Sequence, residues 1–239
     1  MISVCVATHN GERYIKEQLE SILSQLSDGD EVVVSDDGST DSTLQVIDSI
    51  NDNRIKVLHY QQSLSTCHMH KYVCCNFQNA LIHAKGDYIF LSDQDDIWLP
   101  NKVDVCMQYL QNSDLVIHDF RHIDNNLKVL KSYNYGERFK FGNYLLLRRG
   151  KYYGCAMAFR RHMLDYAIPF PKSLLVHDIW IGLLAEALGR VSYIPEPLLL
   201  YRNHHQNTST TSNSLCFKLF YRIEFVFHLI SRVVSCKIR

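Results

Sequence analysis

The first ninety residues alternate between short apolar runs and longer segments whose apolar residues recur every three or four positions. Runs rich in valine and isoleucine predict buried strands, and the three-to-four spacing predicts helices packed along one side. The predicted strands cover residues 2–8, 31–35, 56–60 and 88–91. The predicted helices cover residues 13–25, 41–50 and 71–84. This alternation indicates an α/β fold with a mostly parallel sheet and helices on both faces.

The pattern is less regular in the second half. The predicted helices there cover residues 98–111 and 178–188, and the predicted strands cover residues 115–123, 154–159 and 191–201. Pro195 and Pro197 are expected to interrupt the last strand. Residues 125–151 are polar, aromatic and basic without a clear period. Because no clear linker is visible, we expect residues 1–212 to form one domain and residues 213–239 to form a C-terminal extension.

The extension is expected to form an amphipathic helix. Its apolar face would contain Leu215, Leu219, Phe220, Ile223, Val226, Phe227, Ile230, Val233 and Val234. Its polar face would contain Lys218, Arg222, His228 and Arg232. Residues 215–239 hold five lysines and arginines and one glutamate, a net charge of +4. Such a helix either lies in a membrane interface or packs against the domain.

Charge and cysteine spacing limit the class of protein. The chain carries 25 basic and 25 acidic residues, and this zero formal net charge argues against a general nucleic-acid-binding protein. Its eight cysteines form no C-x-x-C pair, which disfavours a thiolate zinc site. The sequence opens on a strand without a basic and apolar leader, so we expect a cytoplasmic protein with reduced cysteines. No apolar stretch reaches about 18 residues, so no membrane-spanning helix is expected.

Two of the predicted strands end in acidic residues. Asp93, Asp95 and Asp96 follow the fourth strand, and Asp36 and Asp37 follow the second. Parallel strands bring their carboxyl ends to one edge of a sheet, where ligands bind in open α/β folds. Three crowded carboxylates favour a divalent cation such as Mg²⁺ or Mn²⁺, although a solvated loop or helix caps would also explain acids at these positions.

Several other nucleotide or metal sites are disfavoured. The first strand-to-helix turn, residues 8–13, lacks G-x-G-x-x-G, and the chain has no Walker-type Gly-Lys-Ser/Thr. An EF-hand loop starting at Asp93 would need glycine and glutamate where the chain has Trp98 and Asp104. A dinucleotide oxidoreductase, a P-loop NTPase and an EF-hand are therefore all disfavoured.

A set of short motifs, in order over about residues 2–209, resembles the family 2 glycosyltransferases of the GT-A fold. Each motif is weak alone, and their combination is specific. The motifs are Val4-Cys5-Val6-Ala7-Thr8-His9-Asn10-Gly11, Leu19 to Gln25, Val34 to Asp41, Asn79-Ala80-Leu81, Gly86 through Pro100, His177-Asp178 and Tyr201 to His204. Two positions depart from the family pattern, which usually has Tyr at His9 and often has Glu at His177.

The resemblance implies a reaction and a role for each matched residue. The family moves a sugar from a nucleotide-diphosphate sugar to an acceptor hydroxyl, with Mn²⁺ or Mg²⁺ as the cofactor. Asp178 would be the general base of an inverting displacement. The implied donor-binding residues are Thr8, Asn10, Asp36, Asp37, Asp93 and Arg202. The implied metal ligand is Asp95, with Asp96 and His204 as further candidates.

The expected partners follow from the same resemblance. The donor would be a UDP-hexose or dTDP-rhamnose, and the acceptor a saccharide, often polyprenyl-diphosphate-linked, in surface polysaccharide synthesis such as that of O-antigen. That acceptor favours the membrane-surface interpretation of the C-terminal helix, on the inner face of the cell membrane. The aromatic and basic residues of 133–153 are either acceptor-binding residues or an irregular packed subdomain.

Two alternatives from other classes stay open at the level of sequence. A haloacid-dehalogenase-like phosphohydrolase would use Asp93 as a nucleophile, although three strands precede it here and that strand usually opens such a domain. A non-catalytic nucleotide-sugar-binding protein is the second alternative, and only the presence of Asp95 and Asp178 speaks against it.

Overall fold

The computed structural model describes residues 1–61, 69–133, 152–203 and 215–238. The strands are β1 (Ile2–Thr8), β2 (Glu31–Asp36), β3 (Ile55–His59), β4 (Tyr88–Ser92), β5 (Ile97–Trp98), β6 (Leu115–Ile123), β7 (Val129–Tyr133), β8 (Met157–Arg160) and β9 (Val191–Arg202). The helices are α1 (Ile15–Leu23), α2 (Thr43–Ser49), α3 (Met69–His83), α4 (Lys102–Leu110), α6 (Met163–Ala167), α7 (His177–Leu188) and α8 (Leu215–Ile238), with a 3₁₀ turn, η1, at Gly154–Ala156. The α/β fold expected from the alternating pattern is confirmed.

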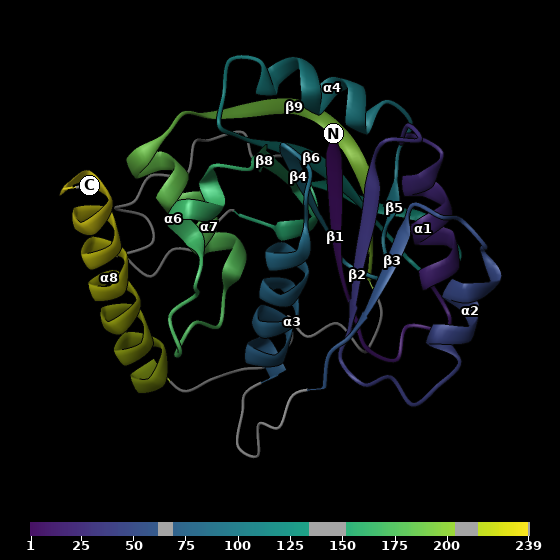
Figure 1. The fold of residues 1–239 in the computed structure, drawn as a ribbon, viewed down its shortest axis with the longest axis horizontal. Coiled ribbons are helices and arrows are strands. Elements are labelled where there is room, and N and C mark those ends of the chain that lie inside the picture. The colour runs from purple at the N-terminus through teal and green to yellow at the C-terminus, as the bar shows by residue number, and fades with distance from the viewer. Residues whose placement is uncertain (62–68, 134–151, 204–214, 239) are drawn as a thin grey trace.

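The strands form one sheet in the order β3-β2-β1-β4-β8-β6-β9-β5, and β7 pairs with β6 outside this row. The first four strands are parallel, as predicted. The second half is mixed, because β8 is antiparallel to both β4 and β6 while β9 is parallel to β6. Helices lie on both sides of this sheet, with α3 on the side away from α1 and α2 (Figure 1).

The central strands are buried on both faces, which explains their continuous apolar sequences. Val4, Cys5 and Val6 of β1 are fully buried, as are Phe90 and Leu91 of β4. A parallel strand covered by helices on both faces has no solvent side, so it needs no alternating polar residue. The carboxyl-terminal ends of β1, β2 and β4 carry the polar residues discussed below.

The helix predicted to begin at Trp98 begins four residues later. Ile97 and Trp98 instead form β5, an antiparallel pairing with Leu199 and Leu200 of β9. Pro100 disfavours helical backbone at the residue before it. Asn101 then takes a left-handed conformation, with φ of 68°, immediately before α4. The prediction was wrong at this end because the apolar spacing continued through a segment whose backbone turns.

The remaining differences lie in the second half of the chain. The strand predicted from Gly154 begins only at Met157, because residues 154–156 form η1. Strand β7 falls in the segment that had shown no clear period. Strand β9 runs through Pro195 and Pro197, and its register with β6 shifts beside Asp119. That shift is the interruption expected from the two prolines, since proline cannot donate a ladder hydrogen bond.

Helix α8 lies along the outer edge of the molecule against α6 and α7 (Figure 1). Phe225 and Leu229 are buried there, and the Arg232 guanidinium donates to the carbonyl oxygens of Tyr166 and Pro169, both at 2.7 Å. The packing alternative is therefore confirmed for this face of the helix. In the described parts of the chain, no helix is both long and apolar enough to cross a membrane. The boundary predicted at 212 falls outside the described residues.

Candidate active site

Three parallel strands end together at one edge of the sheet. Strand β1 lies between β2 and β4, with Thr8 opposite Asp36 and Val6 opposite Ser92. The backbone N–H of Asp37 donates to the carbonyl oxygen of Thr8 at 3.0 Å. The expected meeting of two acidic strand ends beside the end of the first strand is therefore present in the structure.

Gln94 joins the acidic loop after β4 to the end of β1. Its Oε1 accepts hydrogen bonds from Thr8 Oγ1 at 2.6 Å and from the His9 backbone N–H at 2.9 Å. Its Nε2 donates to the His9 carbonyl oxygen at 3.2 Å. A Cβ atom at Gly11 would lie 2.6 Å from the same Oε1, so glycine leaves room for this contact. Thr8, predicted to bind the donor, thus also fixes the acidic loop.

The turn after β2 is held by its own side chains. Asp36 is buried, and one of its oxygens accepts from the Ser39 backbone N–H at 3.0 Å while the other accepts from the Ser39 hydroxyl. Asn10 has a φ of 49°, and its Oδ1 accepts from the Thr40 N–H at 2.8 Å. Hydrogen bonds within the turn therefore account for Asp36, and the half-buried Asp37 lies nearer to solvent. Donor contacts by these residues stay predictions.

The three acids after β4 form a repulsive cluster. Burial is the main cause that raises the pKa of Asp93 to about 7, with the charges of Asp95 and Asp178 as the next causes. Burial also raises the pKa of Asp96, with Asp95 and Asp93 as the next causes. Within the described residues, Asp96 Oδ2 is buried without a hydrogen-bond partner. Crowded carboxylates with an unpaired buried oxygen suit a hard divalent cation, so these residues fit the metal that the fold implies.

Arg202 supports this loop from behind. It is 3% exposed, its backbone N–H donates to Asp96 Oδ1 at 3.0 Å, and its Nε donates to the Asp95 carbonyl oxygen at 2.9 Å. Its guanidinium also forms an ion pair with Glu17 at 2.6 Å and lies 4.8 Å from the ring centroid of Tyr14. These contacts hold the acids in place. They differ from the donor contact predicted for Arg202, which stays a prediction.

Asp178 lies at the start of α7 and faces the acidic cluster. Its Oδ1 accepts from the Ile179 N–H at 2.7 Å, and the Gly154 N–H also donates to its carboxylate. Burial nevertheless raises the pKa of Asp178 to about 6. A carboxylate with a raised pKa near neutrality is suited to accept a proton, so both the predicted base role and the predicted helix-start role are compatible with the structure.

His177, which departs from the family pattern, is a core residue. Its ring stacks on Phe77 with a centroid separation of 4.2 Å, and its Nδ1 lies 3.8 Å from Cys74 Sγ. Burial is the main cause that lowers the pKa of His177 to about 3, and the charge of His70 is the second cause. A neutral histidine therefore occupies this position without adding charge beside Asp178.

Sequence reasoning missed three residues of the site. Cys155 Sγ and the carboxylate oxygens of Asp93 and Asp96 all lie within 4.8 Å of one another. Lys102 is completely buried, and its Nζ donates to the Cys155 carbonyl oxygen at 2.7 Å. Gly154 precedes Cys155 in the chain, and its backbone N–H forms a hydrogen bond with the Asp178 carboxylate. No sequence pattern marked these residues, because Gly154 and Cys155 reach the site through the pairing of β8 with β4, and Lys102 reaches it from the start of α4.

Comparison with known proteins decides the family. Residues 3–166 match the family described as Glycosyl transferase family 2. The chain belongs to this family. An uncharacterized glycosyltransferase of Nostoc is 26% identical over 227 residues, covering 89% of this chain and 68% of the relative. The Escherichia coli protein WfgD, named a UDP-Glc:alpha-D-GlcNAc-diphosphoundecaprenol beta-1,3-glucosyltransferase, is 29% identical over 133 residues, 55% of this chain and 50% of WfgD.

Solved structures confirm the GT-A fold of this glycosyltransferase. The structure of S. aureus TarS in complex with UDP-GlcNAc has a TM-score of 0.66 at 20% identity, covering 98% of this chain and 72% of TarS. The mannosyltransferase PcManGT from Pyrobaculum calidifontis, in complex with GDP-Man and Mn²⁺, has a TM-score of 0.62 at 18% identity, covering 98% of this chain and 73% of the other. Family membership decides against the phosphohydrolase and the non-catalytic alternatives.

Some predicted site residues of the glycosyltransferase are not described. His204 and residues 134–151, including Arg148 and Arg149, lie outside the described residues. In the described part of the predicted acceptor stretch, Tyr152 is buried and donates to Glu186 Oε1 at 2.8 Å. Tyr133 stacks on Phe120 with a centroid separation of 4.6 Å. These two tyrosines contribute to packing, as the packed-subdomain alternative requires.

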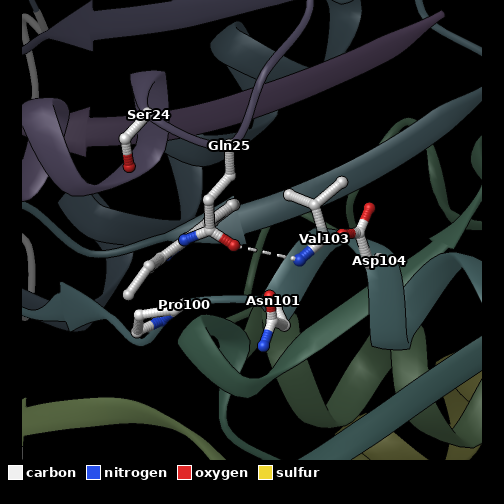
Figure 2. Close-up of a pocket in the computed structure, with 7 residues that line it drawn as sticks. Ser24, Gln25, Pro100, Asn101, Val103 and Asp104 are labelled. Carbon is white, nitrogen blue, oxygen red and sulfur yellow. Dashed lines mark hydrogen bonds between the residues drawn. The ribbon is translucent and has the colours of Figure 1, made fainter.

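A separate cavity of about 350 Å³ lies beside β5 and the start of α4 (Figure 2). Its lining includes Trp98, Pro100 and Asn101, and Gln25 Oε1 accepts from the Val103 N–H at 3.2 Å across it. None of its lining residues is a predicted donor, metal or base residue of the glycosyltransferase. It therefore does not belong to the candidate active site.

Proposed function

We propose that this glycosyltransferase transfers a hexose from a nucleotide-diphosphate sugar to a saccharide hydroxyl with inversion at the anomeric carbon. The observation that supports this proposal is one carboxylate with a raised pKa, Asp178, close to the acids at the end of β4, which the proposal assigns to metal and donor rather than to a nucleophile. One displacement inverts the reacting carbon, whereas a double displacement needs a carboxylate nucleophile.

The proposed reaction proceeds in one step. Asp178 accepts the proton of the acceptor hydroxyl as that oxygen attacks the anomeric carbon. The bond between the anomeric carbon and the diphosphate oxygen breaks, and the diphosphate leaves with the electron pair. A divalent cation, when bound by Asp95 with Asp93 or Asp96, supplies positive charge beside the departing diphosphate. Gly154 and Ile179 orient the base through their backbone N–H groups.

A UDP-hexose is the first choice of donor, and dTDP-rhamnose the second. Support comes from the names of two similar proteins, WfgD, whose donor is UDP-Glc, and TarS, whose structure holds UDP-GlcNAc. WfgD also uses a diphosphoundecaprenol-linked acceptor. By analogy, we propose a lipid-diphosphate-linked saccharide acceptor and a role in surface polysaccharide synthesis, such as that of O-antigen, at the inner face of the cell membrane.

Two variants test the catalytic proposal. Asp95→Ala should abolish Mn²⁺-dependent donor binding, measured by calorimetry with a panel of nucleotide sugars in Mn²⁺ and in EDTA. Asp178→Asn should bind the donor as the wild type does, and its transfer rate should fall by about 10²–10⁴-fold. The amide keeps the size of the side chain and cannot accept the proton. Normal transfer by Asp178→Asn would remove this residue as the base.

Helix α8 supports a membrane-surface location. It packs on the domain through the face that holds Phe225, Leu229 and Arg232, and it leaves its more apolar face outside. Seven large apolar side chains on this outer face are at least half exposed: Leu219, Phe220, Ile223, Phe227, Ile230, Val234 and Ile238. A soluble monomer rarely exposes such a continuous apolar row, whereas a basic helix with one can insert it between lipid headgroups.

The row of seven side chains makes the membrane proposal testable. Phe220→Ser with Phe227→Ser should reduce co-sedimentation with vesicles that contain anionic lipid by at least about tenfold, because two aromatic anchors are lost. The control pair, Ile82→Ser with Leu130→Ser, changes two exposed apolar residues outside α8 and should not alter binding. Equal binding by both double variants, or a stable dimer that binds no vesicle, would contradict a membrane role.

A further inference from the structure

Lys102, the first residue of α4, is a buried cation at the inner side of the active site. It is 0% exposed, although lysine is rarely buried without a partner. Its Nζ donates to the Cys155 carbonyl oxygen at 2.7 Å and lies 4.1 Å from the ring centroid of Trp98. These two contacts do not neutralise an ammonium group, and burying an unneutralised charge is costly.

The neutralising charges come from the acids that are proposed to hold metal and donor. Burial lowers the pKa of Lys102 to about 8, and the charges of Asp96 and Asp93 act in the opposite direction, which favours the ammonium form. The charge of Lys102 in turn acts to lower the pKa of Asp93. Cys155 lies between Lys102 and the acids. Its carbonyl oxygen accepts a hydrogen bond from Lys102, and its Sγ lies within 4.8 Å of the carboxylate oxygens of Asp93 and Asp96. The ammonium and the acids therefore share one buried electrostatic unit.

The turn formed by residues 154–156 also contacts Asp178, the proposed base. The Gly154 N–H donates to the Asp178 carboxylate. The next residue is Cys155, whose carbonyl oxygen accepts the hydrogen bond from Lys102. A Cβ atom at Gly154 would lie 3.1 Å from His177 Nε2 and 3.8 Å from Asp178 Cβ, so the turn packs closely on the start of α7. Anchoring residues 154–156 thus fixes the base relative to the acids.

We propose that Lys102 is a positioning residue with two linked effects: its ammonium group is a counter-cation of Asp93 and Asp96, and it anchors the 154–156 turn that orients Asp178. This inference rests on the proposed function, because it assumes that the acids hold a divalent cation. A fixed positive charge on the inner side weakens the binding of that cation on the outer side. It also keeps the acids assembled when no cation or donor is bound.

Three substitutions separate charge from hydrogen bonding. Lys102→Gln removes the charge and keeps an N–H donor, Lys102→Met removes both, and Lys102→Arg keeps both. Loss of one fixed charge beside a dication should tighten Mn²⁺ binding by about tenfold or more in the Gln and Met variants. Lys102→Arg should bind Mn²⁺ as the wild type does. Mn²⁺ affinity is measured on the full chain by electron paramagnetic resonance of the free ion, without donor or acceptor.

Turnover gives the second readout. Lys102→Met should lower kcat for transfer by about 10–100-fold, with the donor KM changed less than about threefold, because the base is misplaced while the donor-binding residues remain. Lys102→Gln, which can still donate to the Cys155 carbonyl, should retain more of the transfer rate than Lys102→Met. A residue that only stabilised the fold would change the melting temperature without tightening Mn²⁺ binding.

The outcomes distinguish this inference from the proposed function. If the wild type binds Mn²⁺ through Asp95 and the folded Gln and Met variants bind it no more tightly, the counter-cation role is overturned and the proposed function stands. If the wild type binds no Mn²⁺, or Asp95→Ala binds it unchanged, the proposed metal site fails and this inference fails with it. Circular dichroism checks folding, and Lys102→Gln serves as the test if Lys102→Met does not fold.

Discussion

At the scale of single residues, the acids of the site differ in what surrounds them. Asp36 accepts a hydrogen bond from the Ser39 backbone N–H in the turn after β2. Asp96 accepts one from the Arg202 backbone N–H. Loss of hydration raises the pKa of the half-buried Asp93 to about 7, with the charges of Asp95 and Asp178 as further causes, and raises the pKa of the half-buried Asp178 to about 6. Both carboxyl groups therefore change protonation near neutral pH.

The pKa of Asp178 predicts a pH dependence. A general base works only when deprotonated, and burial raises this pKa to about 6. The transfer rate at saturating donor, acceptor and Mn²⁺ should therefore rise with pH between about 5 and 7, with its midpoint near 6. The rate is measured by product formation across this range. If the residual transfer rate of Asp178→Asn rose with pH over the same range, the titration would belong to another group.

At the scale of secondary-structure elements, α8 has two apolar faces with different uses. Phe225 is 3% exposed against Trp180, whereas Phe227, two residues later, is 70% exposed. Phe225→Ala should lower the free energy of unfolding by about 3–5 kcal/mol, because it leaves a cavity between α8 and α7. Phe227→Ala is the matched control and should change it by less than about 0.5 kcal/mol.

Urea unfolding monitored by circular dichroism checks this pair. If both variants unfold at the wild-type urea concentration, α8 does not contribute to the stability of the domain through this contact. If both are equally destabilised, the outer face is covered in solution, and its exposure in the monomer would not support membrane binding.

At the scale of the whole molecule, binding of metal and donor should increase the stability of the folded state. Metal and donor are expected to bind where β1, β2, β4 and α7 meet, so binding joins elements far apart in the sequence. At a donor concentration about 100 times Kd, the folded state gains about 2.7 kcal/mol. For a chain of this length that corresponds to a rise in melting temperature of about 5–10 °C.

Thermal denaturation with the donor panel measures this rise. It should require Mn²⁺ or Mg²⁺, disappear in EDTA and be absent in Asp95→Ala. A full shift in the presence of EDTA would show that donor binding is independent of the metal, contrary to the proposed function.

The sequence by itself determined the strands and helices of the first half and the acidic strand ends. It could do so because a strand buried on both faces is continuously apolar, and because parallel strands must end at one edge. It placed Thr8, Asp36 and Asp93 at that edge without knowledge of their partners. The start of α4 was predicted too early, because apolar spacing does not reveal a backbone turn such as that at Asn101.

Only the tertiary structure decided which side chains face one another. The contacts of Lys102 with Cys155, of Gly154 with Asp178 and of Arg202 with Asp96 join residues separated by more than twenty positions in the chain, so no local pattern records them. The helix at the C-terminus is a further case, since its apolar pattern was visible while the face it buries was not. Periodicity reports which residues share a face, and only packing determines which face meets the domain.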